Sequence, residues 1–178
     1  MKTLQTLSKL SFIALSLFFV SCGGSDDDTY YPPATSMPTN DSFVLGKVNG
    51  ADFSSLIFGT STAVCNKFSN QQGGEIITIL GADLAANSIT ISLWEVTTTG
   101  VYTLNRNTES FLNYSPGSGE VAFATSADCD NATGTINVTY IDDVKVEGTF
   151  SFTGVDTENC AGGSKTVTEG SFRGTFPN

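Results

Sequence analysis

The chain has 178 residues with a formal net charge of −10, from 18 acidic and 8 basic residues, and it contains no histidine. Such acidity repels phosphate backbones and argues against nucleic-acid binding. The lack of histidine removes the commonest general base, the commonest zinc ligand and the usual partner of a catalytic serine, so we expect neither a metal nor a cofactor.

The first 21 residues have the pattern of a secretory signal peptide. Lys2 and Lys9 supply positive charge, and residues 10–20 form an apolar run of 11 residues. This run is shorter than the roughly 20 residues that a membrane-spanning helix needs. Removal of the segment takes away two basic residues and no acidic one, which leaves six basic and 18 acidic residues and a net charge of −12.

The stretch Phe19-Val20-Ser21-Cys22 resembles the recognition site of a lipoprotein signal peptidase. In such sites the cysteine is acylated through a thioether and becomes the new N-terminus, and the residues before it are small. Leu usually stands three positions before the cysteine, and Phe19 departs from that pattern. The resemblance implies that Cys22 carries two or three acyl chains such as palmitate, because one chain alone binds membranes weakly. The alternative is an ordinary signal peptide with an unrelated cysteine.

Ser25, Asp26, Asp27 and Asp28 follow Cys22 closely. Acidic residues at this position resemble the export signal of surface lipoproteins in Gram-negative bacteria of the Bacteroidota type. The resemblance implies an anchor in the outer membrane and a protein that faces the cell exterior. A solvated linker is the alternative interpretation.

Residues 22–41 are predicted to be an extended, disordered tether. They are rich in Pro, Thr, Ser and Asp and show no hydrophobic periodicity. Pro32, Pro33 and Pro38 also oppose a regular helix or a central strand.

Residues 42–178 are predicted to form a single β domain. Short runs of Val, Ile, Thr, Phe and Tyr alternate with clusters of Gly, Asn, Asp and Ser, and no segment has convincing helical periodicity. Roughly nine strands predict an all-β domain with little or no helix, built from hairpins as an antiparallel β-sandwich or a closed barrel. Outside the main hairpin, the predicted strands are 43–48, 56–64, 75–80, 88–96, 100–104, 120–125 and 166–176.

The clearest signal is a β-hairpin between residues 134 and 154. Apolar and polar residues alternate on both sides of Asp142-Asp143, which predicts one apolar face and a turn at the two aspartates. Gly148 interrupts the apolar row and predicts a bulge or a close contact. The predicted apolar face consists of Ile136, Val138, Tyr140, Val144, Val146, Phe150 and Phe152.

Four segments of the domain carry a resemblance to a known group of proteins. They read GKVNGADF (46–53), TGVYTL (99–104), VEGTFSFTG (146–154) and VTEGSFRG (167–174). Over most of the domain the chain resembles an uncharacterised family of Bacteroidota surface lipoproteins. These motifs are turn glycines and core aromatic residues, so the resemblance implies a fold and a location but no catalytic residue.

Cys65, Cys129 and Cys160 remain once Cys22 is assigned to the lipid. An oxidising envelope predicts one disulfide and one unpaired thiol. Folding the hairpin about its turn brings Cys129 near Cys160, so we favour this pair, with Cys65–Cys160 as the next choice. The chain-entropy treatment predicts about 3–4 kcal/mol of stabilisation for a separation of this length.

Trp94 is the first candidate ligand contact. The apolar residues of the predicted strand 88–96 share one face and Trp94 lies on the other, so Trp94 faces solvent if the first face packs on the core. Exposed aromatic rings near Asn and Thr stack on sugars in carbohydrate-binding sandwiches. Tyr102 and Tyr114 are the candidates to extend such a platform. The alternative is that a loop or a second sheet covers Trp94.

Acidic residues offer two weaker candidates. A hydrolase needs two carboxylates roughly 5–9 Å apart, whereas Glu95, Glu120 and Glu147 each fit solvent-facing positions. Asp128 and Asp130 only faintly resemble a calcium loop, because the Gly and the distal Glu are not at the expected spacing.

The sequence therefore predicts a lipid-anchored surface protein without catalytic residues. Its expected partners are the membrane, through the lipid, and a glycan or protein ligand, which makes it a binding or envelope-assembly module. The alternative is a carbohydrate-binding or carboxylate-based glycoside-acting surface protein.

Overall fold

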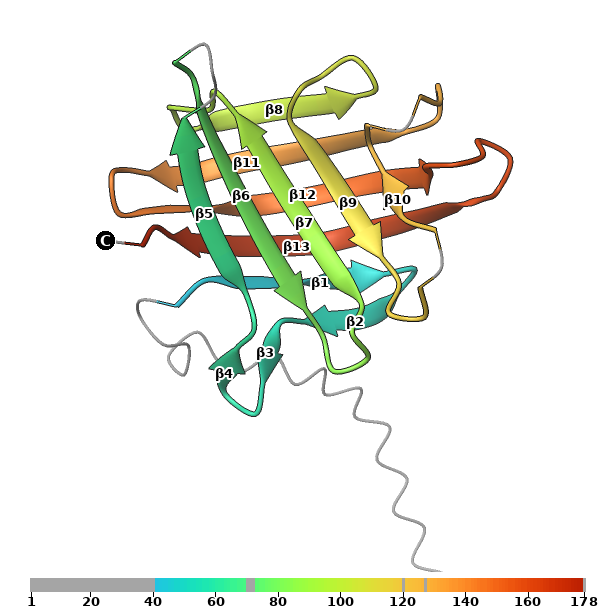
Figure 1. The fold of residues 1–178 in the computed structure, drawn as a ribbon, viewed down its shortest axis with the longest axis horizontal. Helices are drawn as coiled ribbons and strands as arrows, with labels where there is room; N and C mark the ends of the chain where they lie inside the picture. The colour runs from blue at the N-terminus through green and yellow to red at the C-terminus, as the bar shows by residue number, and fades with distance from the viewer. Residues whose placement is uncertain (1–40, 70–72, 120, 127, 178) are drawn as a thin grey trace, which may run out of the picture. The chain divides into compact units, whose positions relative to one another are not determined.

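The computed structural model describes residues 41–69, 73–119, 121–126 and 128–177 (Figure 1). These residues form strands and turns without any helix, so the predicted all-β class is confirmed. The described part of the chain has no helix that is long and apolar enough to cross a membrane. The predicted signal peptide (1–21), Cys22, the export signal (25–28) and all of the tether (22–41) except its last residue lie outside the described residues.

The described residues contain thirteen strands, which is more than the sequence predicted. In chain order they are β1 (Phe43–Val48), β2 (Ala51–Ser54), β3 (Leu56–Ile57), β4 (Thr60–Ser61), β5 (Val64–Ser69), β6 (Glu75–Ala82), β7 (Ser88–Trp94), β8 (Gly100–Asn105), β9 (Phe111–Ser115), β10 (Phe123–Ala124), β11 (Thr133–Ile141), β12 (Lys145–Asp156) and β13 (Ser164–Thr175). Eleven of them join one antiparallel sheet, and β3 and β4 form a separate small hairpin.

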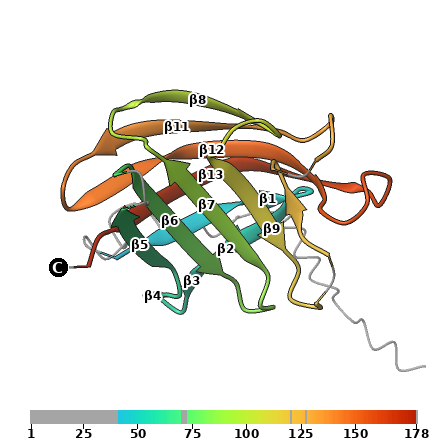
Figure 2. The ribbon, with the colours of Figure 1, turned by 45° about the horizontal axis from the view of Figure 1, so that its top comes forward.

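The large sheet curls over itself into two layers. We call β2, β1, β13, β12, β11 and β8 the long layer, and β10, β9, β7, β6 and β5 the short layer, in the order of their pairing. Figures 1 and 2 show β5, β6, β7 and β9 crossing over the strands of the long layer. The sheet passes between layers at β12, which pairs with β11 over most of its length and with β10 at Val155 and Asp156.

The hydrophobic core lies between the two layers. Each strand turns alternate side chains inward, so both layers supply one row of apolar residues per strand. The short layer contributes Ile77, Ile79, Ile89, Ile91 and Leu93, and the long layer contributes Ile136, Val146, Phe150, Phe152, Val167 and Phe172. The faces that point away from this core are the outer surfaces discussed below.

The predicted hairpin is present as β11 and β12, with one difference near its turn. A β-bulge between Val138 and Tyr140 inserts Thr139, which changes the parity of the strand. Tyr140 therefore points outward, with 41 % of its surface exposed, while Ile141 packs against the core. Val144 belongs to the turn and is 56 % exposed, so its predicted place in the apolar face is wrong, as it is for Tyr140.

Hydrogen bonds to Asp142 hold the turn of this hairpin. Its carboxylate accepts hydrogen bonds from the Tyr140 hydroxyl and from the backbone N–H groups of Val144 and Lys145, at 2.6, 2.8 and 2.8 Å. These bonds hold the pKa of the Asp142 carboxyl below its ordinary value. The aspartate turn that the sequence predicted is therefore built by the side chain as well as the backbone.

Gly148 marks a close contact, one of the two alternatives predicted for it. A Cβ atom at this position would meet the carbonyl oxygen of Asn137 and would lie 2.9 Å from the ring of Phe172. Phe172 is 1 % exposed and sits at the centre of the core. Glycine is thus required here so that β11, β12 and a large core ring can approach one another.

Several predicted strands need correction. The segment 56–64 is not one strand, because Phe58 and Gly59 adopt left-handed backbone angles (φ 50° and 82°) and make a turn between β3 and β4. The sequence pattern did not predict β2, β5 and β9. Where it predicted a strand over 120–125, only the short strand β10 forms.

Candidate functional site

Trp94 lies at the end of β7 on the face that points away from the core. Ile89, Ile91 and Leu93 of the same strand are fully buried, and Trp94, which has the opposite parity, is only partly buried. Its backbone N–H donates a hydrogen bond of 2.8 Å to Ser110 Oγ. Glu95 then adopts a left-handed backbone (φ 54°), which ends the strand and directs Val96 into the core. These features fix the position of the tryptophan on the outer side of the short layer.

Tyr102 and Tyr114 do not extend a platform around Trp94, so this predicted arrangement is wrong. Tyr102 pairs with buried Ile136 and packs against the core, and its hydroxyl donates a 2.7 Å hydrogen bond to the Thr98 carbonyl. Tyr114 pairs with buried Ile89 and is only 8 % exposed. Because directly paired residues share a face, both tyrosines belong to the core side of their strands.

A different set of residues surrounds Trp94. Phe68 of β5 pairs with Ile76 of β6, and Ile76 pairs with Trp94, so the three side chains form one row across the outer side of the short layer. Phe111 of β9 pairs with Ser92 and lies beside this row. Neighbouring strands are about 4.8 Å apart, so Phe68 and Trp94 stand about 10 Å apart.

We call this surface the aromatic face. It consists of the apolar residues Val64, Phe68, Ile76, Leu80, Trp94 and Phe111 and the polar residues Asn66, Thr78, Thr90, Ser92 and Asn113. Val64, Phe68 and Leu80 are 51 %, 50 % and 38 % exposed. None of these side chains is charged, and the neighbouring Lys67 and Glu75 pair with each other at 3.1 Å. The face therefore combines the half-exposed ring of Phe68 and the partly buried rings of Trp94 and Phe111 with neutral hydrogen-bonding groups.

Phe68 and Phe111 were not predicted as site residues because the strands that carry them, β5 and β9, were not predicted. The stretch VCNKFS (64–69) alternates Val, Asn and Phe on one face, and FLNYS (111–115) alternates Phe, Asn and Ser. Both show the two-residue period of a strand, but polar residues dilute the signal. Counting this alternation would have found both aromatic residues.

The outer side of the long layer has a different chemistry. Thr133 pairs with Asn105 and Thr153, and Thr153 pairs with Thr166. We call this surface the hydroxyl face, and it consists of Val101, Thr103, Asn105, Thr133, Thr135, Asn137, Thr149, Ser151, Thr153, Thr166, Thr168 and Ser171. Two shallow hollows of about 350 and 320 Å³ lie on it. The side chains that make up this face are mostly small and neutral and include no aromatic ring, but Phe150 and the charged Glu169 also line the hollow of about 350 Å³.

The acidic residues near the hydroxyl face are engaged in ion pairs. Glu147 Oε1 lies 2.9 Å from Lys145 Nζ and 2.7 Å from Arg173 Nε. Partial burial raises the pKa of the Glu147 carboxyl, but the hydrogen bonds and charges of Lys145 and Arg173 outweigh it and lower the pKa below the ordinary value. Glu120, another predicted candidate, lies outside the described residues. Glu147 is thus held as a structural carboxylate rather than left free for acid–base chemistry.

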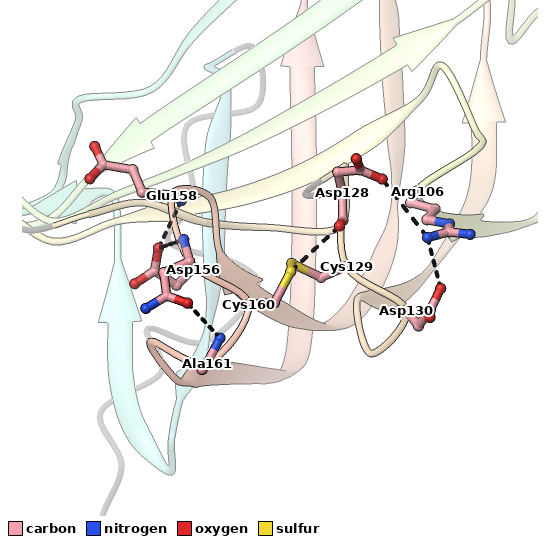
Figure 3. Close-up of a disulfide and its surroundings, with 9 residues drawn as sticks. Arg106, Asp128, Cys129, Asp130, Asp156, Glu158, Cys160 and Ala161 are labelled. Atoms are coloured by element: carbon pink, nitrogen blue, oxygen red, sulfur yellow. Dashed lines mark hydrogen bonds and ion pairs between the residues drawn. A yellow bond between two sulfur atoms is a disulfide. The ribbon is translucent and has the colours of Figure 1, made fainter.

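The acidic loop near residue 130 also has a cationic partner from the protein. Arg106 Nη1 lies 2.8 Å from Asp130 Oδ1 and 3.8 Å from Asp128 Oδ1 (Figure 3). No group of three or more His, Cys, Asp or Glu side chains suited to a metal ion occurs within the described ranges. The guanidinium of Arg106 therefore places a positive charge beside both carboxylates.

Cys129 and Cys160 form a disulfide, which is the pairing that the sequence favoured. Their Cα atoms are 5.6 Å apart, and the bond joins the loop before β11 to the loop after β12 (Figure 3). Asp156 shapes the second loop, because its Oδ1 accepts hydrogen bonds from the N–H groups of Glu158 and Asn159 at 2.8 and 2.9 Å. The disulfide therefore closes the end of the hairpin opposite its turn.

Among the cysteines that the structure describes, Cys65 is the one with a free thiol. It is 8 % exposed on the core side of β5, and burial raises its pKa to about 12. A thiol of this kind stays protonated and unreactive in the folded protein.

A smaller polar hollow of about 180 Å³ lies beside Tyr114. Asp52, Asp83 and Lys165 contribute to its lining. The Asp83 carboxylate is already engaged, since its Oδ1 accepts hydrogen bonds from the N–H groups of Ala85 and Asn87 at 2.8 and 2.9 Å. Because the Asp83 carboxylate is already hydrogen-bonded, this hollow is a weaker candidate for a ligand site than the aromatic face.

Comparison with known proteins places the domain in a family but assigns no activity. No curated protein and no solved structure was found to match the chain. Residues 42–175, from before β1 to the end of β13, match a family described as a domain of unknown function, DUF6252. The match covers most of the chain, and the protein therefore belongs to the DUF6252 family.

Proposed function

We propose that this protein is a lipid-anchored, non-enzymatic binding module on the outer membrane, facing the cell exterior, and that the aromatic face is its ligand-binding surface. The observation that carries the proposal is the row formed by Phe68, Ile76 and Trp94, which leaves half of Phe68 exposed on an uncharged surface. Exposed apolar surface of this kind in an acidic domain is typical of a contact site. The core does not require it, because these residues point away from it.

The N-terminal sequence supports the anchoring part of the proposal. Cys22 would carry the lipid and Asp26, Asp27 and Asp28 would direct export. We expect labelled palmitate to be incorporated into the wild-type protein and not into Cys22→Ser. We also expect protease added to intact cells to cleave the wild type and to spare a variant with all three aspartates changed to alanine. Protection of both proteins would place the domain in the periplasm and contradict the export step.

The binding part can be tested on cells with two matched cysteine variants. Val64→Cys reports on the aromatic face, with the Phe68 and Trp94 rings left in place, and Val101→Cys reports on the hydroxyl face; both positions are exposed (51 % and 68 %). Buried Cys65 provides little background reaction with a membrane-impermeant maleimide. In purified protein the two variants should react alike. On intact cells, Val64→Cys should react more slowly than Val101→Cys because the aromatic face is occupied; equal rates on cells would contradict the binding role.

If the ligand is another protein, the binding function would be a role in envelope assembly. A protein partner would protect Val64→Cys and would also co-purify with the wild type but not with Phe68→Ala. A carboxylate-based hydrolase has less support, because Glu147 is held by Lys145 and Arg173.

A further inference from the structure

The spacing of rings on the aromatic face limits what can lie on it. Phe68 and Trp94 are separated by two strand spacings, about 10 Å. Ile76 between them is only 8 % exposed although its position in β6 points outward, so it forms an apolar floor between the two rings. Two flat rings at this separation match alternate sugar rings, the first and the third of three, in an extended chain that runs across the strands, and Ile76 then lies under the middle sugar.

Polar groups lie directly beside the rings. Asn66, Thr78 and Ser92 form the next row, about 7 Å along the strands from the ring row, and Phe111 continues that row on β9. Within the described part of the chain, the side chains of Asn66 and Thr78 make no hydrogen bond with another protein group. They are therefore free to donate to and accept from a bound molecule.

The charge of the surroundings narrows the class of ligand. An anionic chain would be repelled by a domain with an acidic excess, and the cation that borders Phe68, Lys67, is already paired with Glu75. A cationic ligand would find no carboxylate among the side chains that make up the aromatic face, and Glu75 beside Phe68 is engaged by Lys67. Acyl chains would cover Asn66, Thr78 and Ser92 without hydrogen-bonding them, which is unfavourable for buried polar groups. A neutral ligand with both apolar and hydroxyl surfaces avoids each of these costs.

A pyranose ring with equatorial hydroxyls has that combination. Its axial C–H groups form an apolar side that packs on the negatively polarised face of an aromatic ring. Its hydroxyls project from the rim, where the Asn, Thr and Ser side chains lie. We propose that the aromatic face binds an extended, uncharged glycan, with sugar rings over Trp94 and Phe68; this inference rests on the proposed binding function.

The position of Trp94 makes this inference directly measurable. Trp94 is the only tryptophan in the chain, so its fluorescence reports on the aromatic face alone. We would titrate the full-length protein with cellohexaose, xylohexaose and mannohexaose at up to millimolar concentration. At least one of them should shift the Trp94 emission to shorter wavelength. Phe68→Ala should weaken that binding about ten-fold, because it removes one stacking ring and leaves the reporter in place.

Two controls give the result its meaning. Val101→Ala on the hydroxyl face should leave the affinity within about two-fold of the wild type, and so should a change from low to high salt, because no ion pair forms. The inference is overturned if none of the three oligosaccharides shifts the emission, if Phe68→Ala binds as tightly as the wild type, or if binding disappears at high salt.

Two further probes distinguish a failure of the glycan inference from a failure of the proposed binding function. Phosphatidylcholine vesicles test a lipid ligand, and sedimentation over a range of protein concentrations tests a second copy of the chain. One outcome is that the wild type binds vesicles or self-associates, loses that property in Phe68→Ala, and binds no glycan. This result would overturn the glycan inference and leave the aromatic face as a binding surface for another ligand. The maleimide rates on cells decide the binding function separately.

Discussion

On the outer side of the short layer, Phe68 and Trp94 stand among Asn, Thr and Ser, whereas the hydroxyl face of the long layer carries mainly Thr, Ser and Asn. Both surfaces cover the same core, and the charged side chains Lys145, Glu147 and Arg173 beside the hydroxyl face are held in ion pairs. Threonine is favoured on exposed strands because it has high β propensity and a hydroxyl for water. The hydroxyl face thus shows what solvation alone selects in this fold. Phe68 and Leu80, left 50 % and 38 % exposed, are not explained in that way.

The largest expected effect concerns the disulfide that closes the hairpin under the hydroxyl face. Replacing Cys129 and Cys160 together by alanine should lower the free energy of unfolding by about 3–4 kcal/mol, because the open chain gains entropy when unfolded. Urea denaturation measures the loss. Hydrogen exchange should accelerate more in β11 and β12 than in β6 and β7. A loss below about 1 kcal/mol, or equal acceleration in both layers, would contradict this distinction between the layers.

A second test compares the two sides of one strand in the long layer. Gly148→Val should destabilise the domain by about 2–3 kcal/mol, because the new side chain meets Asn137 and the ring of Phe172. Thr149→Val, one residue further on the hydroxyl face, should change stability by about 0.5 kcal/mol or less. Thermal or urea denaturation of the Gly148→Val and Thr149→Val variants measures the two losses of stability. Similar losses in both variants would mean that the hydroxyl face also carries stability.

The ion pairs at the edge of the hydroxyl face predict a pH dependence. The pKa of Glu147 is lowered in the folded state, so its contribution is present above the pKa of the unfolded chain and is lost as pH falls through the folded value. Glu147→Gln should therefore cost about 1 kcal/mol at neutral pH, since the group is partly exposed, and almost nothing in strong acid. Glu169→Gln, whose carboxylate pairs with Lys47 but is 60 % exposed, is the matched control and should cost less.

For Glu147, the measurement is the free energy of unfolding of both variants over a range of pH. A cost for Glu147→Gln that stays constant into strong acid would show that the carboxylate charge is not what stabilises the hairpin.

The smallest expected effect on stability is at the aromatic face itself. Phe68→Ser should change the free energy of unfolding by about 0.5 kcal/mol or less, because the ring is half exposed and lies outside the core. Binding of a fluorescent hydrophobic dye should fall at the same time. A loss above about 2 kcal/mol would mean that Phe68 is a structural residue, and the comparison between the faces would fail.

The parts of the fold that the sequence predicted are those with strong local patterns. The alternation around Asp142 gave the β11–β12 hairpin, and the geometry of that hairpin favoured the Cys129–Cys160 pairing. The motif at 46–53, whose glycines were assigned to turns, contains Asn49 and Gly50, which form the turn between β1 and β2 with left-handed angles (φ 49° and 85°).

The parts that it did not predict depend on single residues or on distant strands. The bulge at Thr139 reverses which side chains face the core, and no local pattern announces it. Phe58 adopts a left-handed turn conformation that is uncommon for an aromatic residue. The row of Phe68, Ile76 and Trp94 requires three strands to align, since Phe68 and Trp94 are 26 positions apart in the sequence. Tyr114 was misplaced for the same reason, because only the pairing of β9 with β7 decides which way it points.

The passage of the sheet between layers within β12 has a mechanical consequence. One edge of β12 is hydrogen-bonded first to β11 and then to β10, so a single backbone belongs to both layers. A pull on the aromatic face is transmitted through β9 and β10 to β12 as tension on peptide hydrogen bonds. The two layers therefore cannot slide apart by losing side-chain contacts alone. Under mechanical load the domain should unfold as one unit. Its weakest point should be the β10–β12 junction, because that pairing is only two residue pairs long.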